Sequence, residues 1–406
     1  MKWKLERADK FCKSVRDGTH DTPKQVDFGF KLITAKNIKN GQVDLGDAYN
    51  ISEKDYIKIN ERSKVEKWDV LMSMIGNGLG RSAVIKDNPK YAIKNLALFK
   101  IGNEVKAKWL HYFLCSNEGQ GIIFNTLQGS GQPFISLNLL RGLLIPVPPL
   151  TVMKKVIKIL SLYDDLIENN QKQIKLLEEA AQRLYKEWFV DLRFPGYENT
   201  PIIDGVPEGW SKKQLVNVFD YVRGKSYSSK EIVNSGNTLL INLKNIRAFG
   251  GYNRNAEKYY VGKYGDSQKV QAGDIIMSVT DMTQERRLVG HVAIVPNIPK
   301  TMIFSMDLIK LIPLTVKNSF LYSTMFFGGY SKRIATLANG TNVLHLKPES
   351  MMNMELLVPS NEIMIKYDDK FRNFYQRIEV LENQNIILAE ARGRLLPKLM
   401  NGEVEV

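Results

Sequence analysis

The sequence contains little cysteine and little histidine, and those residues are not clustered. Two cysteines cannot build a disulfide framework, which favours a protein that works inside the cell. Zinc sites need Cys and His close together along the chain or in the fold. His111 and Cys115 have i,i+4 spacing, but two ligands do not make a metal site. The sequence therefore predicts neither a disulfide scaffold nor a metal centre from these six residues: Cys12, Cys115, His20, His111, His291 and His345.

Long apolar runs are also absent from the sequence. The most apolar stretch, residues 143–150, contains three prolines, and the first seven residues lack the apolar core of a signal peptide. We therefore expect no transmembrane segment.

Motifs for catalysis are missing too. Gly224-Lys225-Ser226 resembles the end of a P-loop, but position 219 is Phe where the motif needs Gly. There is no Gly-x-Ser-x-Gly elbow and no Asn-Pro-Pro-aromatic motif of amino-group DNA methyltransferases. The acidic pairs Asp164-Asp165 and Asp368-Asp369 are interpreted as solvated helix faces. The sequence thus predicts a binding protein without catalytic residues of its own.

Basic residues are abundant. The 57 Lys and Arg residues exceed the 43 Asp and Glu residues, which gives a formal net charge of +14. Such a charge indicates a polyanionic partner, which is more often nucleic acid than an anionic membrane surface.

The two halves of the chain repeat one pattern at an offset of 205–211 residues. For example, residues 34–38 (TAKNI) match 242–246 (NLKNI), and residues 95–100 (NLALFK) match 305–310 (SMDLIK). The matched pieces keep their order, whereas the loops between them differ, as at 76–80 against 280–289. Two copies of one scaffold with different loops indicate two binding specificities.

Each copy divides into a globular part and a long helix. Residues 1–150 and 210–360 show short strands with turn signals, such as 70–75 and 275–279, and few long helical patterns. Residues 151–192 and 361–402 follow proline-containing extended segments and show helical periodicity. The Pro- and Gly-containing segment 193–209 is predicted to be a linker.

Apolar residues on both long helices alternate at steps of four and three, which is the seam of a coiled coil. Pairing Asn170 with Asn385 requires antiparallel helices whose facing positions sum to 555. The alternative is that each helix packs only on its own globular part. The predicted seam residues are Ile167, Asn170, Ile174, Leu177 and Leu184 on the first helix, and Phe371, Ile378, Leu381, Asn385 and Leu388 on the second.

Candidate DNA contacts lie in loops and carry the side chains that read base edges or hold phosphates. Asp281 and Glu285 in the same region would repel phosphate, unless they lie beside Arg or accept from cytosine. The first copy supplies Arg16, Lys36, Asn37, Asn77, Arg81, Ser130 and Gln132. The second supplies Arg223, Lys225, Lys244, Asn245, Gln284, Arg286, Arg287, Asn339, Thr341 and Asn342.

Several segments resemble the specificity subunit of Type I restriction–modification enzymes. Residues 128–136 (QGSGQPFIS) with 145–150 (IPVPPL) are similar to the end of that family's target-recognition domain. Residues 167–190 resemble its central helix, 206–210 (VPEGW) the start of its second recognition domain, and 394–403 its C-terminal end. The order of these segments and the tandem repeat together make the resemblance specific.

The resemblance implies an α+β protein with two globular α/β target-recognition domains in tandem repeat, joined by two long helices that form an antiparallel coiled coil. It implies a non-catalytic subunit whose domains each read one half of an asymmetric, bipartite site in double-stranded DNA through the major groove. The coiled coil would set the spacing and dock two modification (adenine methyltransferase) subunits. Two restriction (motor-nuclease) subunits would complete the complex. S-adenosylmethionine, ATP and Mg²⁺ would belong to those partners, with no cofactor on this chain. The resemblance also implies a cytoplasmic location in a prokaryotic cell, in association with DNA and without a membrane partner.

Two other classes stay open at this point. A stand-alone nuclease or methyltransferase with unrecognised motifs would consume S-adenosylmethionine or cut DNA as the purified chain. A basic coiled-coil scaffold for RNA or membrane would show no DNA sequence preference.

Overall fold

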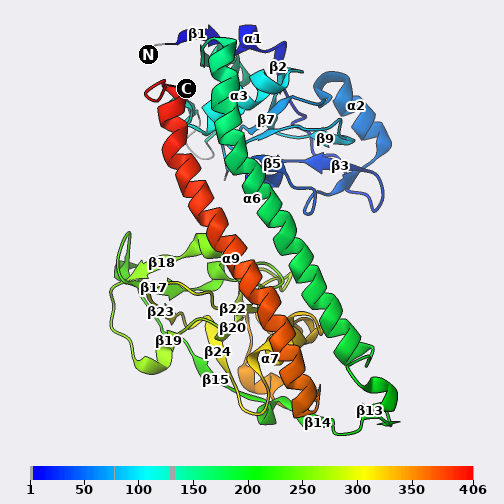
Figure 1. The fold of residues 1–406 in the computed structure, drawn as a ribbon. Coiled ribbons are helices and arrows are strands. Elements are labelled where there is room, and N and C mark those ends of the chain that lie inside the picture. Colours follow the sequence, from blue (N-terminus) through cyan, green and yellow to red (C-terminus); the bar gives the residue numbers. More distant parts are fainter. Residues whose placement is uncertain (1–2, 77, 129–132, 406) are drawn as a thin grey trace. The chain divides into compact units, whose positions relative to one another are not determined.

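A computed structural model describes residues 3–76, 78–128 and 133–405. The chain forms two compact units (Figure 1), one made of Met1–Glu168 with Asn385–Val406, and one made of Asn169–Gln384. The unit boundaries fall inside the two long helices, so each helix contributes residues to both units. From the sequence, each helix was predicted to be a separate segment. We describe each unit by itself.

The first unit is built on an antiparallel four-stranded sheet in the order β2-β10-β7-β8, next to a three-stranded sheet in the order β6-β3-β9. Strands β3 and β9 are parallel, and two further pairs, β1-β11 and β4-β5, are antiparallel. The strands are β1 (Lys4–Arg7), β2 (Ser14–Asp17), β3 (Phe30–Ile33), β4 (Ile38–Lys39), β5 (Gln42–Val43), β6 (Asn50–Ile51), β7 (Val70–Ser73), β8 (Ser82–Val84), β9 (Tyr91–Ile93), β10 (Leu96–Lys100) and β11 (Leu144–Val147). The helices are α1 (Ala8–Phe11), α2 (Glu53–Ser63), α3 (Glu104–Cys115), α4 (Asn117–Asn125) and α5 (Leu137–Gly142).

The second unit repeats this topology. Its four-stranded sheet has the order β15-β24-β20-β22, and its second sheet has the order β16-β18-β17-β23-β19 with β17 and β23 parallel. The sheet strands are β15 (Phe219–Arg223), β16 (Ile232–Val233), β17 (Thr238–Ile241), β18 (Lys258–Tyr260), β19 (Lys269–Val270), β20 (Ile275–Ser278), β22 (Val292–Ile294), β23 (Thr301–Phe304) and β24 (Leu308–Pro313). The paired short strands are β12 (Ile202–Ile203) with β13 (Val206–Pro207), β14 (Ser211–Gln214) with β26 (Glu355–Val358), and β21 (Thr280–Asp281) with β25 (Leu344–His345). The helices of the globular part are α7 (Asn318–Phe326) and α8 (Tyr330–Ala335).

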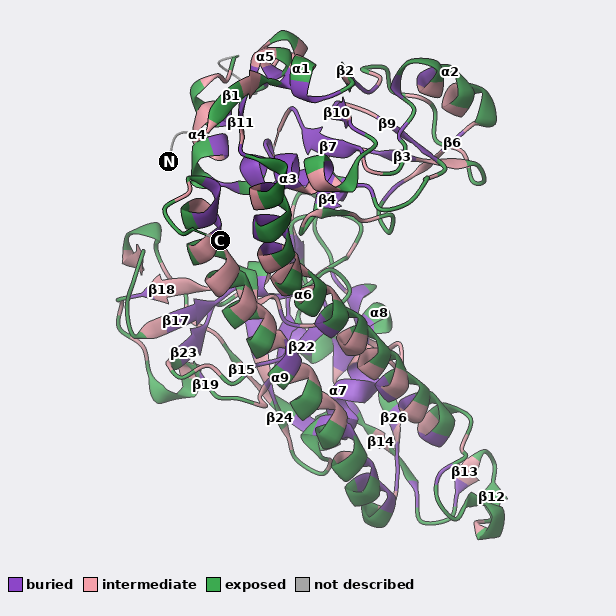
Figure 2. Cartoon of the chain, turned by 45° about the horizontal axis from the view of Figure 1, so that its top comes forward, coloured by how far each residue is buried: buried purple, intermediate pink, exposed green. Residues whose placement is uncertain are grey.

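The four-stranded sheets have the same order in both units, and β18-β17-β23 repeats β6-β3-β9, with β16 and β19 added at the two sides in the second unit. This confirms the tandem repeat as a repeat of fold. Strand β7 (Figure 2) and strand β20, both within segments predicted to be strands, are buried along their whole length. Apolar side chains on both faces of these central strands pack into the cores on the two sides of each sheet. The burial of this apolar surface stabilises the fold.

The sequence did not predict helices α3 and α7, which occupy equivalent places in the repeat. Seven of the twelve residues of α3 are buried, and so are seven of the nine residues of α7. A helix covered on nearly all sides has no polar face, and therefore lacks the amphipathic pattern by which helices are recognised.

One buried ion pair also repeats. Lys100 Nζ lies 2.6 Å from Asp69 Oδ2, and at the equivalent place Lys310 Nζ lies 3.7 Å from Asp274 Oδ2. Asp69 is 1% exposed, and this burial raises its pKa above the ordinary value. Asp69 also accepts backbone N–H bonds from Glu66 and Ile101, so its carboxylate holds the ends of β7 and β10 together.

The long helices α6 (Leu150–Tyr185) and α9 (Asn361–Met400) pair antiparallel in both units. In the first unit, Val156 and Leu160 near the start of α6 share a core with Leu399 near the end of α9. In the second unit, Tyr185 at the end of α6 shares a core with Tyr367 near the start of α9. The globular parts contribute to the same cores, so each helix packs both on its partner and on a domain.

Two polar pairs fix the register of the helices. Asn170 donates to Gln384 over 3.3 Å in the second unit, and Arg392 donates to Asp164 in the first. These positions sum to 554 and 556 and so bracket the predicted 555. The predicted partner of Asn170 was wrong by one residue, because its amide reaches Gln384, whereas the buried Oδ1 of Asn385 has no hydrogen-bond partner.

The interpretation of Asp164 as part of a solvated face was also wrong. Its carboxylate accepts from the Tyr112 hydroxyl over 2.6 Å and from Arg392, so it ties helix α3 to both long helices. Asp165 and Asp369 are exposed as expected, and Asp368 pairs with Arg372 one turn later at 2.5 Å.

After α6 the chain forms a π-helical turn over Lys186–Val190 and a segment with the β12-β13 hairpin. Phe194, near the start of the predicted linker, and Trp210, directly after it, are both buried, and their rings contact each other at a tilt of 37° with centroids 4.8 Å apart. Among the described residues, no helix is long and apolar enough to cross a membrane.

Candidate nucleic-acid interface

One edge of the central sheet gathers the variable loops in each unit. In the second unit, β15 ends at Arg223 and β20 ends at Ser278, while β22 begins at Val292 and β24 begins at Leu308. Because the neighbouring strands are antiparallel, these four ends lie at the same edge. The loop between β20 and β22, which the sequence singled out as variable, therefore projects from this edge.

Asp281 organises that loop. Its carboxylate is 1% exposed and accepts backbone N–H bonds from Thr283, Leu288 and Val289 at 2.9, 2.6 and 3.2 Å, and a bond from the Thr283 hydroxyl at 2.9 Å. Burial alone would raise the pKa of Asp281, but the N–H donors outweigh it and hold the pKa below the ordinary value. Asp281 therefore acts inside the loop, as a support that its sequence position alone did not reveal.

A second loop lies against the first. Strand β21 pairs with β25, and Gln284 donates to the Thr341 carbonyl oxygen at 2.6 Å. The second loop is closed by a bridge between Asn339 and His345. Thus the two loops form one surface, which carries six of the predicted contacts: Gln284, Arg286, Arg287, Asn339, Thr341 and Asn342.

The two arginines of this surface have different surroundings. Arg287 is exposed and lies 2.7 Å from Glu285, which agrees with the expectation that a carboxylate here would stand beside an arginine. Arg286 has a left-handed backbone with φ of 51°. Its Nη2 donates to the Ala338 carbonyl at 3.5 Å, and its buried Nε has no hydrogen-bond partner.

The remaining predicted contacts of the second unit lie at the end of β15 and after β17. Arg223 is exposed, with Nη2 3.5 Å from Glu349, and Lys244 is exposed on a 3-10 turn. Lys225 pairs through its backbone with Ser305. Gly224 has no room for a side chain, because a Cβ there would meet the Ser305 carbonyl oxygen at 2.1 Å.

The first unit has the same close approach at Gly18, where a Cβ would meet the Ile93 carbonyl oxygen at 2.3 Å. This repetition explains Gly224 as a packing requirement of the fold. The segment after Gly224 does not have the structure of a P-loop, because a P-loop leads into a helix and this segment leads only into the short 3-10 turn Ser229–Glu231.

In the first unit, Arg81 is exposed directly before β8, and Lys36 is exposed on a 3-10 turn. Arg16 is exposed and donates to the Arg62 carbonyl oxygen at 2.9 Å. A bridge between Ile75 and Phe134 pairs the two variable loops, as in the second unit. The predicted contacts Asn77, Ser130 and Gln132 lie outside the described residues.

The structure corrects the role of two predicted contacts, Asn37 and Asn245. Both side chains are 0% exposed and both form capping boxes of equivalent 3-10 turns. Asn37 Nδ2 donates to the Asp44 carbonyl oxygen at 3.0 Å, and Asn245 Nδ2 donates to that of Asn253 at 3.2 Å. A fully buried amide with its donors and acceptors used is not available to DNA, so both residues support the turn that follows them.

His111 and Cys115, which have i,i+4 spacing on α3, lie close together in the first unit. Within the described ranges, no group of three or more His, Cys, Asp or Glu residues could hold a metal ion. His111 contacts the Ser82 hydroxyl at 2.9 Å and the Cys115 sulfur at 3.8 Å. Burial is the largest single effect on the pKa of His111 and lowers it, but Cys115 and Asp164 together outweigh burial and hold this pKa above the ordinary value. The predicted absence of a site at this pair remains a prediction.

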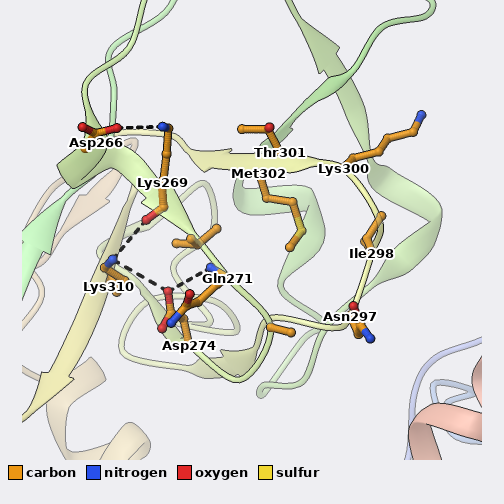
Figure 3. A pocket seen from close by; sticks show the side chains of 12 residues that line it. Asp266, Lys269, Gln271, Asp274, Asn297, Ile298, Lys300, Thr301, Met302 and Lys310 are labelled. Carbon is orange, nitrogen blue, oxygen red and sulfur yellow. Dashed lines mark hydrogen bonds and ion pairs between the residues drawn. The ribbon is translucent and has the colours of Figure 1, made fainter.

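An open cleft of about 520 Å³ lies beside β19 and β23 in the second unit (Figure 3). Its three lysines all have partners in the domain. Lys269 lies 2.7 Å from Asp266, Lys310 donates to the Lys269 carbonyl oxygen at 3.0 Å, and Lys300 donates to the Tyr259 hydroxyl at 2.9 Å. The cleft contains none of the predicted DNA contacts.

The chain is basic and contains two copies of one fold. The copies carry different paired loops at the same sheet edge, and the two long helices run antiparallel. These features define a two-domain protein of the sequence-recognition class. Residues 4–179 and 207–389 match the family described as the Type I restriction modification DNA specificity domain. These matches span most of the chain, and the chain belongs to this family as a specificity subunit with two DNA recognition domains.

Individual relatives agree with this assignment. The chain is 26% identical over 313 residues to the Type I restriction enzyme MjaIX specificity subunit of Methanocaldococcus jannaschii, covering 74% of this chain and 70% of the relative. It is 23% identical to the HindI specificity subunit of Haemophilus influenzae, covering 84% and 88%. The crystal structure of the S subunit of a Type I restriction–modification system from M. genitalium has the same fold, with a TM-score of 0.56, 14% identity, and coverage of 98% and 96%.

Proposed function

We propose that this chain directs a Type I restriction–modification complex to an asymmetric, two-part DNA sequence. Each recognition domain reads one half-site in the major groove with the paired loops at its sheet edge. The observation that carries this proposal is the pairing of different loops at the same edge of two equal folds. Equal scaffolds with different loops are what two different half-sites require.

The helices α6 and α9 set the gap between the half-sites and dock two modification subunits, which methylate adenine. Their antiparallel pairing and polar register pairs support a fixed spacing. A polar pair at one register position disfavours slippage of a coiled coil. Two restriction subunits complete the complex in the cytoplasm.

This chain contributes no catalytic residue and binds no cofactor in the proposed mechanism. S-adenosylmethionine, ATP and Mg²⁺ serve the modification and restriction subunits. The basic charge of this chain supplies non-specific attraction to phosphates, and the loop side chains supply the discrimination between bases.

Selection from a random DNA library tests the proposal. The full chain in complex with its modification subunits should enrich two short sequences separated by a fixed gap. The full chain alone, incubated with labelled S-adenosylmethionine and DNA, should transfer no methyl groups. Enrichment of one undivided sequence, or methyl transfer by the chain alone, would contradict the proposal.

A further inference from the structure

The two recognition domains contact the long helices through equivalent turns. In the first unit this turn covers residues 38–44, between the capping Asn37 and Asp44. In the second unit it covers residues 246–253, between Asn245 and Asn253. We call these segments the tether turns. Asn37 and Asn245 fix the far end of each turn through the amide bonds described above.

The tether turn of the first unit reaches Glu168 on α6. Gln42 Nε2 donates to Glu168 Oε2 at 3.0 Å. Lys86, from the loop after β8, lies 2.6 Å from the same oxygen. The Glu168 carboxylate on α6 thus binds two segments of the domain.

In the second unit, two residues outside the tether turn reach α9 at the equivalent position. Glu379 follows Glu168 by 211 residues, the offset of the two helices. Its Oε1 accepts the backbone N–H of Asn297, from the loop after β22, at 2.5 Å. Arg254, next to the tether turn, lies 3.6 Å from the same oxygen.

A second carboxylate strengthens the contact in the second unit. Glu382 lies 3.0 Å from Arg247, within the tether turn, and 3.3 Å from Arg254. The Arg254 side chain is 11% exposed, so its pairs with Glu379 and Glu382 are shielded from solvent more than the Lys86–Glu168 pair, whose lysine is 47% exposed. Arg247 is 46% exposed, so its pair with Glu382 is not shielded more. Partly buried pairs are screened less by salt than exposed ones.

The same turn also contacts the DNA-facing loop of its domain. Phe249 N donates to the Arg287 carbonyl oxygen at 2.7 Å, and Gly251 N donates to that of Val292 at 2.8 Å. The tether turn therefore connects the helix on one side with the recognition loop on the other. In the second unit, the Arg247–Glu382 contact on α9 therefore bears on where this turn, and the loop surface beyond it, lies.

We propose that Glu168 and Glu379 are positioning residues for DNA recognition. Each holds its own recognition domain at one place on the long helix that follows it in the chain. The spacing between half-sites is enforced by these two tethers together with the length of the helices. This inference rests on the proposed function.

The test measures methylation by the full chain assembled with its modification subunits, on duplexes whose gap between half-sites varies by single base pairs. E168K should lower the preference for the best gap over its neighbours by roughly threefold, the size expected for a half-exposed ion pair. E379K should lower it more. The half-site sequences should stay the same.

Two further variants separate positioning from general damage. K86E/E168K restores an ion pair with exchanged charges and should recover part of the gap preference. E362K makes the same charge change on α9, where Glu362 pairs only within the helix with Lys366 at 2.6 Å, and should leave the preference unchanged. Amide hydrogen exchange of Asn297, whose N–H bonds to Glu379, should rise in E379K and not in E362K.

Each result has one meaning. Equal gap preference in the starting protein, E168K and E379K would overturn the positioning role. Slow hydrogen exchange retained in E379K would overturn it as well. If the starting complex methylates no two-part sequence at all, the proposed function fails first, and this outcome is visible before any variant is compared.

Discussion

The Asp281 carboxylate accepts four hydrogen bonds inside the loop that carries Arg286 and Arg287. Replacing it by Asn puts an N–H₂ group against N–H donors, and leaving a buried donor unsatisfied costs about 1–3 kcal/mol. We expect D281N to lose discrimination at one half-site, with the other half-site unaffected. Competition binding with single-base variants of each half-site measures this. E285Q, in the same loop, is the matched control, and equal discrimination by D281N would contradict the assigned role.

The same carboxylate predicts a pH dependence. Its pKa in the fold lies below that of the unfolded chain. The stabilisation is therefore fully present above the unfolded value of about 3.9 and is lost as the pH falls through the folded value. Amide exchange of residues 282–289 against pH should show the loop protected down to that range in the starting protein. In D281N the protection should be lower throughout, without this step.

Arg286 and Arg287 test how the loop recognises DNA. Alanine at either position should weaken binding, since each removes a cation from the DNA-facing surface. A residue that reads a base should cost about 1–3 kcal/mol and relax one position of one half-site. A residue that holds a phosphate should weaken binding to all sequences equally and reduce the salt dependence. Binding unchanged in both variants would remove this loop from the interface.

The repeated Asp–Lys pair gives a prediction about stability with a control inside the same chain. K100M leaves Asp69 buried at 1% exposure without its cation, and such losses cost about 3–5 kcal/mol. K310M should cost less, because Asp274 is more exposed at 19% and its lysine lies farther away at 3.7 Å. Thermal unfolding of the full chain measures both. An equal loss in the two variants would contradict the argument.

At the level of elements, the long helices were predictable because their apolar residues recur at regular steps over ten turns. The register followed from a single polar residue, Asn170, and came within one position. Helices α3 and α7 were not predictable in the same way, because their burial on nearly all sides removes the periodic signal. Segments that are distant in the sequence cover these helices, and a local stretch of sequence carries no information about such contacts.

The candidate site shows the same limit. The loops were located from the differences between the two copies, since the scaffold repeats and the loops do not. The distinct roles of Asn37, Asn245 and Asp281 were hidden, because Asn and Asp serve equally well as base readers and as supports of turns. Only their burial and backbone partners separate the two roles. One signal for a structural role was present in the sequence: Asn37 and Asn245 occupy the same position in the two copies, whereas residues that read different bases are expected to differ between them.

Lengthening both helices tests their role as a spacer. Seven residues inserted between Glu168 and Asn169, and seven between Gln384 and Asn385, add a heptad at the boundary of the two units and leave the described contacts within each unit in place. The added length is about 10 Å, so the preferred gap should grow by about three base pairs. Methylation of duplexes with stepped gaps measures it. An insertion in one helix only should abolish activity by breaking the register, and an unchanged gap after the double insertion would contradict the spacer role.

On the scale of the whole molecule, the two halves share one strand order but differ in how each domain is supported. The second domain contacts the helices through two arginines and three glutamates. In the first, Gln42 and Lys86 meet Glu168. A duplicated scaffold keeps the positions of such contacts while the residues at those positions change. This is why the repeat was visible in sequence although its contacts were not.

The most direct test of the central claim is a map of DNA methylation in a host that has no adenine methylation of its own. The modification subunits are expressed with and without this chain. We predict that one two-part motif with a fixed gap becomes methylated only when the chain is present, and that D281N alters one half of that motif. The same methylated motifs with and without the chain would contradict the account.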